Sequence, residues 1–457
     1  MFSYIKNYRI PLVIALLCAI FYGSFAYDLL RSDFIKLISL YTALFVFTYY
    51  LIKIFGWNFW LLAGMGIVFR LLFLPAIPNL SQDFYRFLWD GQLISQAVNP
   101  YIFTPEMFIS NPTNFPGVEI ATATELYAGM GQLNGSHFSN YPPVNQLFFA
   151  IAGFFTGKSI MASVIVLRLI IILADIGILY FGKKLLEHFK LPIHRIFWFF
   201  LNPFIIIELC GNLHFEGVML FFLIWSLYLL IHKKWLFSAV LLGLSISVKL
   251  IPLIFLPLYY QYFVDKGLFG TGFWKLKKFY WMVLATVIVS FLPFYSSEFA
   301  RNFLKTISLW FQDFEFNASV FYVIRWIGFQ VNGWDPIQTV GKILPLIVIA
   351  FVLSISFFRR NKTGKQLFTG MLFAISFYFL LSTTVHPWYV ATPLLLCLFT
   401  KYRFPILWSG LVFLSYSAYR AEGYSENMWL VATEYILLLS FAIWEITRSF
   451  QTRLSAT

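Results

Sequence analysis

The chain has few cysteines and few charged residues for its size. Its three cysteines, Cys18, Cys210 and Cys397, lie inside apolar segments without paired spacing, so they indicate neither a disulfide framework nor a zinc site. No GxGxxG, P-loop or HExxH motif occurs, which leaves soluble nucleotide chemistry and zinc hydrolysis without support. Charged residues make up 12% of the 457 residues, whereas 60% are hydrophobic and 21% aromatic.

Long apolar segments account for this composition. A helix needs about 20 apolar residues to cross a bilayer, and about twelve segments approach that length between charged or Pro, Gly and Asn clusters. The segments lie at 10–27, 34–55, 57–76, 159–182, 196–210, 216–232, 279–297, 342–358, 366–385, 388–400, 404–419 and 427–446. The predicted fold class is therefore all-α, a polytopic membrane protein of about 12 transmembrane helices whose first helix is not cleaved.

The placement of basic residues predicts the topology and explains the net charge of +13. Most Lys and Arg residues fall in short segments that alternate along the chain, including 183–195, 263–278 and 359–365. Such segments stay on the cytoplasmic side, so we expect both termini there and the large 77–158 loop outside, with interfacial helices in it. The charge thus indicates no nucleic-acid partner, and residues 1–457 form a single membrane domain.

Two segments do not fit simple spans. The segment 235–262 carries basic residues on both flanks and is interrupted at Lys249, which leaves two arms of about 13 residues, each about 20 Å long as helix. It predicts a broken helical hairpin with Lys249 near its apex. The segment 144–157 is too short to cross, and we expect an interfacial or re-entrant helix there.

The most informative polar cluster opens the large loop, in the stretch SQDFYRFLWDGQLISQAVNPY. Ser81 can cap a helix that begins at the next residue, and within it Asp83, Arg86 and Asp90 fall on one face at spacings of three and four. Arg86 and Asp90 fit a structural ion pair as well as a site. Asp83 lies nearest the membrane, where an unpaired carboxylate could accept a proton from a substrate hydroxyl.

Lys249 is a functional candidate because a lysine in an apolar hairpin is costly unless it is paired or faces water. A phosphate is its natural partner. The structural alternatives are an extended side chain that reaches the interface and an ion pair with a buried carboxylate such as Asp175. Arg168 and Asp175, seven apart on one helical face, indicate an interhelical ion pair rather than a site.

Polar and aromatic residues also gather at the predicted outer ends of other spans. The motif GNLHFEG holds His214 and Glu216, and TTVHPWY holds His386, Trp388 and Tyr389. Such residues are ordinarily interfacial or hydrogen-bonding fillers, but the topology places both motifs on the side of the large loop.

A third stretch, FQDFEFNASVFYVIRW, brings Glu315, Asn317 and Arg325 to that same side. Its aromatic content fits an interfacial helix equally well.

These pieces together resemble a known family. An Asp in the first outer loop followed by YRFLWDG and NPY, then NYPPVNQLFF, KLIPLIFLP, FNASVFYVIRW and HPWY, is similar to polyprenyl-phosphate-sugar-dependent glycosyltransferases of the C-type (GT-C) fold. The mannosyltransferase-like bacterial members are the nearest in pattern. The resemblance covers about residues 70 to 400. The two N-terminal helices, 1–56, lie outside it, and the sequence gives them no role.

The resemblance implies transfer of a hexose, with mannose expected, from a polyprenyl-phosphate donor to a glycan or lipid acceptor, with inversion. Asp83 would be the general base, and Lys249, in a lysine-proline motif, would hold the donor phosphate. The other substrate-binding candidates are Arg86, Asp90, Tyr141, His214, Glu216, Asn317, Arg325, His386, Trp388 and Tyr389. Related proteins often carry an acid just before the loop Asp, where this chain has Gln82, so the need for a divalent cation stays undecided.

Two other function classes stay open. A secondary transporter or flippase of lipid-linked sugars would also use broken helices and membrane charges, but the chain has no two similar halves. A polysaccharide ligase or polymerase would carry its large loop later. We expect an integral protein of a bacterial cytoplasmic (inner) membrane, in contact with membrane lipid, with its active site outside. The sequence does not identify the sugar, the acceptor or the oligomeric state.

Overall fold

The computed structural model describes residues 2–156, 159–264, 270–312 and 314–454, and it confirms an all-α protein. The α-helices and strands are α1 (Phe2–Tyr27), α2 (Phe34–Phe55), α3 (Phe59–Leu72), α4 (Asp83–Ser95), α5 (Pro105–Ser110), α6 (Ala123–Gly135), α7 (Pro143–Thr156), α8 (Ile160–His188), α9 (Phe197–Phe200), α10 (Glu216–Ile231), α11 (Trp235–Val248), α12 (Tyr260–Phe263), α13 (Thr271–Phe291), α14 (Ser297–Gln312), α15 (Val320–Asn332), α16 (Ile337–Phe357), α17 (Gly364–Leu381), α18 (Ala391–Cys397), α19 (Phe404–Leu411), β1 (Tyr419–Arg420), β2 (Gly423–Tyr424) and α20 (Met428–Leu454). Short 3₁₀ segments are η1 (Pro112–Asn114), η2 (Ile193–Ile196), η4 (Ile251–Tyr259), η5 (Leu292–Phe294), η6 (Pro387–Val390) and η7 (Val412–Ala418), and η3 (Ile205–Gly211) is a π-helix.

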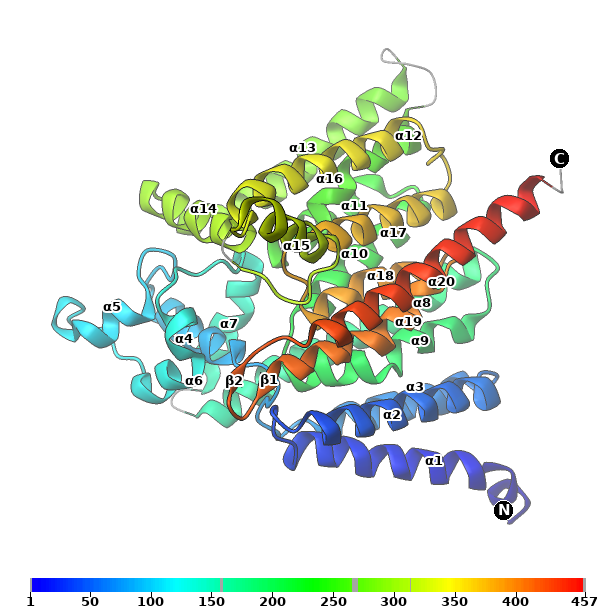
Figure 1. Ribbon diagram of the computed structural model, residues 1–457, viewed down its shortest axis with the longest axis horizontal. Helices are drawn as coiled ribbons and strands as arrows, with labels where there is room; N and C mark the ends of the chain where they lie inside the picture. The colour runs from blue at the N-terminus through cyan, green and yellow to red at the C-terminus, as the bar shows by residue number, and fades with distance from the viewer. Residues whose placement is uncertain (1, 157–158, 265–269, 313, 455–457) are drawn as a thin grey trace.

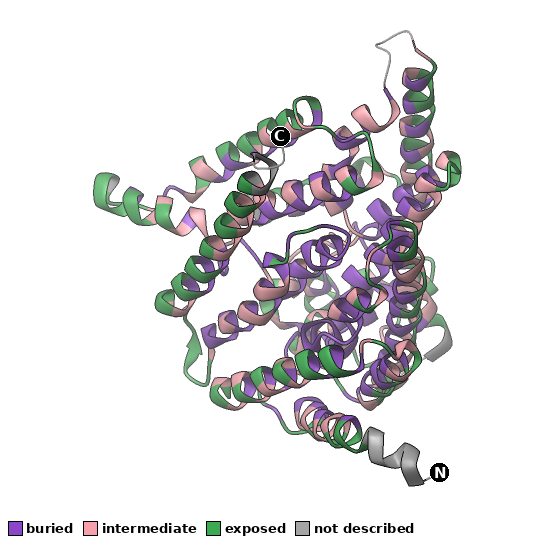
Figure 2. Ribbon diagram, turned by 90° about the vertical axis from the view of Figure 1, so that its right-hand side faces the viewer, coloured by how far each residue is buried: buried purple, intermediate pink, exposed green. Residues whose placement is uncertain are grey.

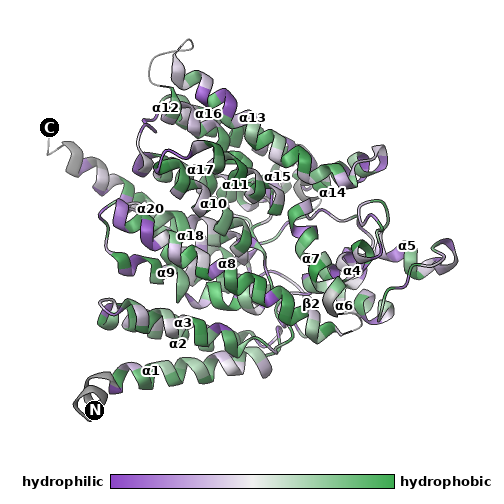
Figure 3. Cartoon of the chain, turned by 180° about the vertical axis from the view of Figure 1, so that it is seen from behind, coloured by the Kyte–Doolittle hydropathy of each residue, from purple (hydrophilic) through white to green (hydrophobic). Residues whose placement is uncertain are grey.

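The helices form a bundle with two distinct ends (Figure 1). The first turns of α1 and the last turns of α20 lie at one end, and the loop helices α4, α5 and α6 lie at the other. Buried residues fill the centre of the bundle, whereas its outer faces are exposed (Figure 2). The helices α10 and α18 are largely buried. Hydrophobic residues fill the middle of the bundle, and hydrophilic residues gather toward its ends (Figure 3). This distribution is that of a bilayer-spanning bundle.

Helix lengths refine the predicted spans. Within the described residues, seven helices are long and apolar enough to cross a membrane: Arg9–Tyr27, Phe34–Phe55, Ile160–His188, Thr271–Phe294, Ile337–Phe357, Gly364–Leu381 and Met428–Ser449. One bent pair, Ile193–Phe200 with Ile205–Gly211, turns by 56° at its break and corresponds to the segment expected at 196–210. The other four expected spans form shorter apolar helices, among them α3 and α10. These four helices are shorter than a full bilayer span: α10 fills almost all of its predicted segment, whereas the 404–419 segment changes from α-helix to the 3₁₀ segment η7 at Val412.

The interruption at Lys249 falls where the sequence predicts it. α11 ends at Val248, and Lys249 takes an extended conformation with φ −147° and ψ 140°. The second arm is the 3₁₀ segment η4 followed by one α-helical turn, because Pro257 interrupts it. This arm returns to the end of the bundle that carries the basic 359–365 segment, which we call the basic end. There the Gln261 side chain donates a 2.7 Å hydrogen bond to the Phe357 carbonyl at the end of α16.

The N-terminal helices α1 and α2 pack firmly on the rest of the bundle. The Tyr41 ring of α2 stacks on Phe413 with centroids 3.7 Å apart, and its hydroxyl donates to the Ser409 carbonyl. Thr48 donates a 3.2 Å bond to the Leu201 carbonyl. Both contacts cross a long stretch of sequence, so the hairpin of α1 and α2 is part of the same body.

Buried ion pairs correct two expectations. Asp175 of α8 pairs with Arg70 of α3, with Nε and Oδ2 2.8 Å apart, so Lys249 is not its partner. Arg168 does not pair with Asp175 either, because its guanidinium donates to backbone carbonyls, including those of Cys210 and Gly211 at 2.9 and 2.8 Å. These carbonyls end the π-helix η3, whose unused acceptors attract the arginine.

Two glycines bring the loop helices together. A Cβ on Gly91 of α4 would lie 2.1 Å from the Phe149 carbonyl oxygen of α7, and one on Gly153 would lie 2.5 Å from Gly91 backbone atoms. Only glycine permits this approach. α7 is 14 residues long, shorter than the roughly 20 residues that a bilayer span needs, and lies against α4; an interfacial or re-entrant position stays a prediction.

A cavity of about 800 Å³ opens at the basic end of the bundle. Its lining includes five basic residues from three separate segments of the chain: Arg195, Arg359, Arg360, Lys365 and Lys401. No acidic residue lines it within the described part of the chain. We refer to it as the basic cavity.

Candidate functional site

A second cavity, with a volume of about 660 Å³, lies at the end of the bundle that holds the loop helices. We call it the outer pocket, because the sequence predicts that this end faces outside. Segments far apart in sequence build it: the turn between α1 and α2, the start of α4, the connection from α6 to α7, the break at residue 249, the residues before α15, the motif after α17, and β1 with β2. Its polar and aromatic lining includes Arg31, Ser81, Gln82, Asp83, Asn134, His137, Asn140, Tyr141, Lys249, Thr306, Glu315, Thr384, His386, Trp388, Tyr389, Tyr419 and Tyr424.

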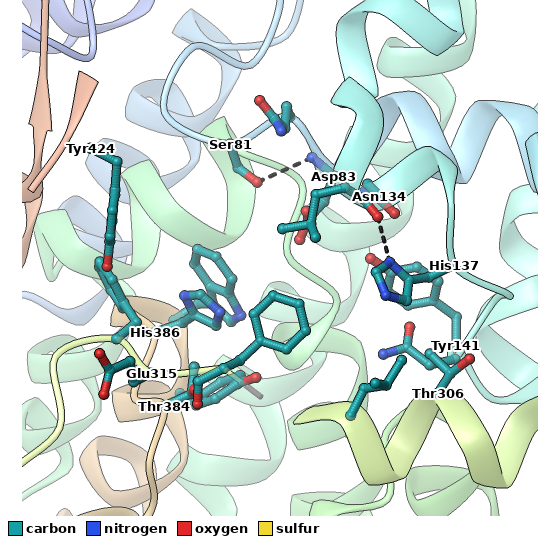
Figure 4. Close-up of a pocket in the computed structure, with 18 of the residues that line it drawn as sticks. Ser81, Asp83, Asn134, His137, Tyr141, Thr306, Glu315, Thr384, His386 and Tyr424 are labelled. Atoms are coloured by element: carbon teal, nitrogen blue, oxygen red, sulfur yellow. Dashed lines mark hydrogen bonds between the residues drawn. The ribbon is translucent and has the colours of Figure 1, made fainter. Parts of the chain in front are cut away.

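Asp83 begins α4 and faces this pocket, with Thr384, Glu315 and His386 across from it (Figure 4). The helix begins one residue later than expected. Ser81 still acts near its start, because its hydroxyl accepts a 3.3 Å hydrogen bond from the Asp83 backbone N–H. Among the described residues, no group donates a hydrogen bond to the Asp83 carboxylate or forms an ion pair with it. A carboxylate in this state keeps its lone pairs for a ligand.

Burial raises the pKa of the Asp83 carboxyl above its ordinary value, and the nearby charges of Lys249 and Arg31 lower it. The two cations therefore help to keep a sheltered carboxylate ionised. Within the described residues, no group of three or more His, Cys, Asp and Glu side chains is placed to hold a metal ion.

Lys249 enters the pocket from the break between α11 and η4, and it forms an ion pair with Glu216. Glu216 lies in the first turn of α10 and is completely buried, whereas the Lys249 side chain keeps 19% of its surface exposed. The ion-pair partner of Lys249 is therefore Glu216 and not Asp175, which the sequence analysis had named as an example. The lysine retains an accessible face, but its charge is largely balanced from within the protein.

An apolar groove of about 400 Å³ continues from the pocket at Lys249. The two cavities share Asn140, Tyr141, Lys249 and Tyr389. The remaining groove lining is almost wholly apolar: Pro142, Leu250, Ile251, Ile254, Ile307, Pro345, Val348, Ile349 and Tyr378. Because Ile349 on α16 is 55% exposed, the groove reaches the outer surface of the bundle, where lipid would lie.

A column of stacked rings forms one wall of the site. His386 stacks on Trp388 with centroids 4.5 Å apart, and the other face of Trp388 stacks on His214 at 3.6 Å. Phe316 covers His386 at 5.1 Å. The backbone joins these layers, because the Val385 N–H donates a 2.8 Å bond to the Phe316 carbonyl. His214 lies behind the wall and supports Trp388 without lining the pocket.

Arg86 and Asp90 lie beneath the pocket as a structural pair. The Arg86 Nε is 2.8 Å from Asp90 Oδ1, and the arginine donates to the carbonyls of Asn134 and His137 at 3.0 and 2.8 Å. Asp90 accepts a further 2.5 Å bond from Ser139. The pair therefore fixes the loop that presents Asn134 and His137 to the pocket.

Asn317 and Arg325 likewise lie outside the lining. Asn317 adopts a positive φ of 47° and donates from its side chain to Glu434 on α20 at 3.3 Å. Arg325 pairs with Glu315, which does line the pocket, and lies over the Tyr322 ring at 4.8 Å. Both residues hold the 314–317 loop in place. Asp313, in the same motif, lies outside the described residues.

Of the candidates from sequence, the pocket brings together Asp83, Tyr141, Lys249, His386, Trp388 and Tyr389. Sequence reasoning missed Arg31, His137 and Tyr424. Arg31 carried a detectable signal, since it lies in a short turn on the predicted outer side, where basic residues are scarce. The other two lie in loops whose position depends on tertiary contacts.

The fold and site thus define a polytopic helical membrane protein with an outer pocket that joins an apolar groove. A model of the family described as alpha-(1->6)-mannopyranosyltransferase, N-terminal domain, matches residues 60–264. The chain is 20% identical over 341 residues to alpha-(1->6)-mannopyranosyltransferase A of Mycobacterium tuberculosis, an alignment that covers 70% of this chain and 61% of that protein. The chain therefore spans less than two thirds of the relative's length. These matches confirm the resemblance to a mannosyltransferase-like GT-C family of membrane proteins.

Proposed function

We propose that the protein transfers a mannose unit from a polyprenyl-phosphate-linked donor to a glycan or lipid acceptor at the extracytoplasmic face of the bacterial inner membrane. The observation that carries this proposal is the outer pocket, which holds the unpaired Asp83 carboxylate and Lys249 together where an apolar groove begins. The similar Mycobacterium tuberculosis protein is named as an alpha-(1->6)-mannopyranosyltransferase.

The cavities suit the two parts of a lipid-linked donor. A polyprenyl chain would lie in the apolar groove, where burial of each CH₂ contributes about 0.8 kcal/mol. Its phosphate would then lie at Lys249, at the junction of groove and pocket. The sugar would occupy the pocket itself, between Asp83 and the ring column of His386 and Trp388.

Asp83 would act as general base in a single displacement. It accepts the proton of the acceptor hydroxyl as that oxygen bonds to the anomeric carbon, and the bond from that carbon to the phosphate oxygen breaks. The electron pair leaves with the polyprenyl phosphate. Attack from the face opposite the phosphate inverts the anomeric configuration.

Transfer by purified full-length protein tests the proposal. Radiolabelled polyprenyl-phosphate-mannose or polyprenyl-phosphate-glucose is incubated with the protein and a native membrane lipid extract, and GDP-mannose serves as the control donor. We expect a labelled product from the mannose donor, with inverted anomeric configuration, and none from GDP-mannose alone. A product only from GDP-mannose, or none from any donor, would overturn the proposal.

A further inference from the structure

The turn between α1 and α2 reaches the outer pocket through Arg31. Both helices precede residue 60, where the match to the family model begins. No role for this hairpin followed from the sequence, yet one of its side chains lines the same cavity as Asp83.

The turn is held in a fixed position relative to Asp83. Asn79, four residues before Asp83, donates from its side chain to the carbonyls of Phe25 and Leu29 at 2.7 and 3.0 Å. An ion pair between Lys36 and Asp28, at 2.7 Å, closes the turn itself. These contacts join the segment that leads into α4 to the turn that carries Arg31, so the two are held together.

Among the described residues, Arg31 forms no ion pair with a carboxylate, although its charge acts on the buried carboxyls of Asp83 and Glu208. Its guanidinium carbon lies 3.3 Å from the centroid of the Tyr419 ring, which supports the flat group from one side. Its Nε is buried without a hydrogen-bond partner. Within the described residues, no carboxylate or carbonyl accepts a hydrogen bond from this side chain.

The other basic groups at the pocket differ in this respect. Lys249 pairs with Glu216, and Arg325, behind the wall, pairs with Glu315. An anion entering the pocket would therefore find at Arg31 a cation whose N–H donors are not already taken by a carboxylate. An arginine stacked on an aromatic ring presents its N–H donors in a planar fork that matches phosphate oxygens.

We propose that Arg31 binds the phosphate of the lipid-linked donor, so that the N-terminal hairpin completes the donor site. The proposal rests on the proposed function. The donor phosphate is a diester with one negative charge, and the released polyprenyl phosphate is a monoester that approaches two at neutral pH. Because the charge grows as the bond breaks, Arg31 would stabilise the leaving group more than the bound donor.

Binding of a short prenyl phosphate to the full chain tests this role. Calorimetry in detergent compares farnesyl phosphate with farnesol, which has the same chain without the phosphate. We expect Arg31→Gln to weaken farnesyl phosphate binding about 10-fold or more, as for loss of a charge-assisted hydrogen bond, and to leave farnesol binding unchanged. Arg31→Lys should retain part of the affinity because it keeps the charge.

Arg420→Gln is the matched control. Arg420 is exposed on β1, next to Tyr419, and does not line the pocket, so its substitution removes the same charge nearby without touching the site. We expect this variant to bind farnesyl phosphate like the wild type.

Each outcome is distinct. If the wild type fails to bind farnesyl phosphate more tightly than farnesol, the proposed lipid-phosphate donor itself is wrong. If the wild type binds it and Arg31→Gln binds it within two-fold, the proposed function stands and the role of Arg31 is wrong. If Arg31→Gln and Arg31→Lys lose the same affinity and the same melting temperature, Arg31 supports Tyr419 and the inference is wrong. If Arg31→Gln raises only the KM for the acceptor, Arg31 binds the acceptor and the inference is also wrong.

Discussion

The two ends of α17 open on cavities that balance charge in opposite ways. At its first turn, the basic cavity is lined by Lys365 and four other basic residues, with no acidic residue in the described lining. Just past its last turn, the outer pocket mixes carboxylates, cations and stacked rings, including Thr384 and His386. α17 has 18 residues, so about 27 Å separates them, close to the thickness of a hydrocarbon core.

The two linings differ in what surrounds their basic side chains. In the basic cavity, the cations lie against neutral groups of the protein: Arg195 donates to the Thr400 carbonyl, Arg359 donates to the Gln366 carbonyl, and no carboxylate belongs to the described lining. In the outer pocket, Lys249 is held by Glu216, and each charge is placed against a specific partner or left open toward the cavity. A reaction on a charged substrate requires charged side chains that are held in fixed positions in this way.

The largest contrast expected between the two ends is their accessibility from outside the cell. A cysteine introduced at Asn114, in the α5–α6 loop, should react with a membrane-impermeant maleimide in intact cells. One introduced at Lys277, near the start of α13, should react only after permeabilisation. The native cysteines are buried, so they give little background. Labelling in the reverse pattern would contradict both the topology and the proposed outer site.

Asp83→Asn should cause the largest loss of activity. Removing a positioned general base lowers turnover about 100-fold or more, while donor binding and melting temperature should stay close to those of the wild type. Steady-state kinetics with the labelled mannose donor measures the loss. Activity within a few-fold of the wild type would assign the base to another carboxylate, with Glu315, which also lines the pocket, the first to examine.

The same residue governs the expected pH dependence. Burial raises the pKa of Asp83, so the reactive carboxylate should be lost as pH falls through a value above the ordinary carboxyl pKa. kcat/KM should decline on that acidic limb. Arg31→Gln removes a cation that lowers this pKa and should move the limb to higher pH, whereas Arg420→Gln should leave it in place.

Lys249→Met should have an intermediate effect on both binding and stability. Loss of the charge should weaken donor binding by about 2 kcal/mol. It also leaves Glu216 buried without a counter-ion, which should cost about 3 kcal/mol of folding stability. Adding Glu216→Gln to this variant should recover the melting temperature but not the donor affinity. Recovery of both would assign Lys249 to structure alone.

The smallest effect is expected at the basic cavity. Arg360→Gln and Lys365→Gln change exposed residues at the end of the bundle away from Asp83, so transfer rates in detergent should stay within about two-fold of the wild type. A loss approaching that of Asp83→Asn would show that the two cavities are not independent.

The sequence predicted the features that depend on local pattern. Apolar length gave the helical class and most spans, and the break at Lys249 followed from its Lys-Leu-Ile-Pro motif. The position of Asp83 at the start of a loop helix also agrees with the structure. Each of these rests on a few neighbouring residues, where periodicity and helix-ending residues are informative.

Features that depend on tertiary packing could not be predicted in this way. Glu216 rather than Asp175 pairs with Lys249 because α10 and α11 lie side by side, whereas α8 turns Asp175 toward Arg70. Arg31 reaches the pocket only because the N-terminal hairpin packs on the bundle with its turn next to Asn79, in the segment that leads into α4. Neither contact leaves a spacing pattern in a single sequence.

The apolar groove has a consequence for how the proposed enzyme would be supplied. A donor whose chain enters between η4 and α16 would arrive by diffusion within the plane of the membrane and would never need to pass through water. Its rate of encounter would follow the number of donor molecules per area of lipid, so diluting the vesicles would leave the rate per enzyme unchanged. Diluting the donor among other lipids would lower it in proportion.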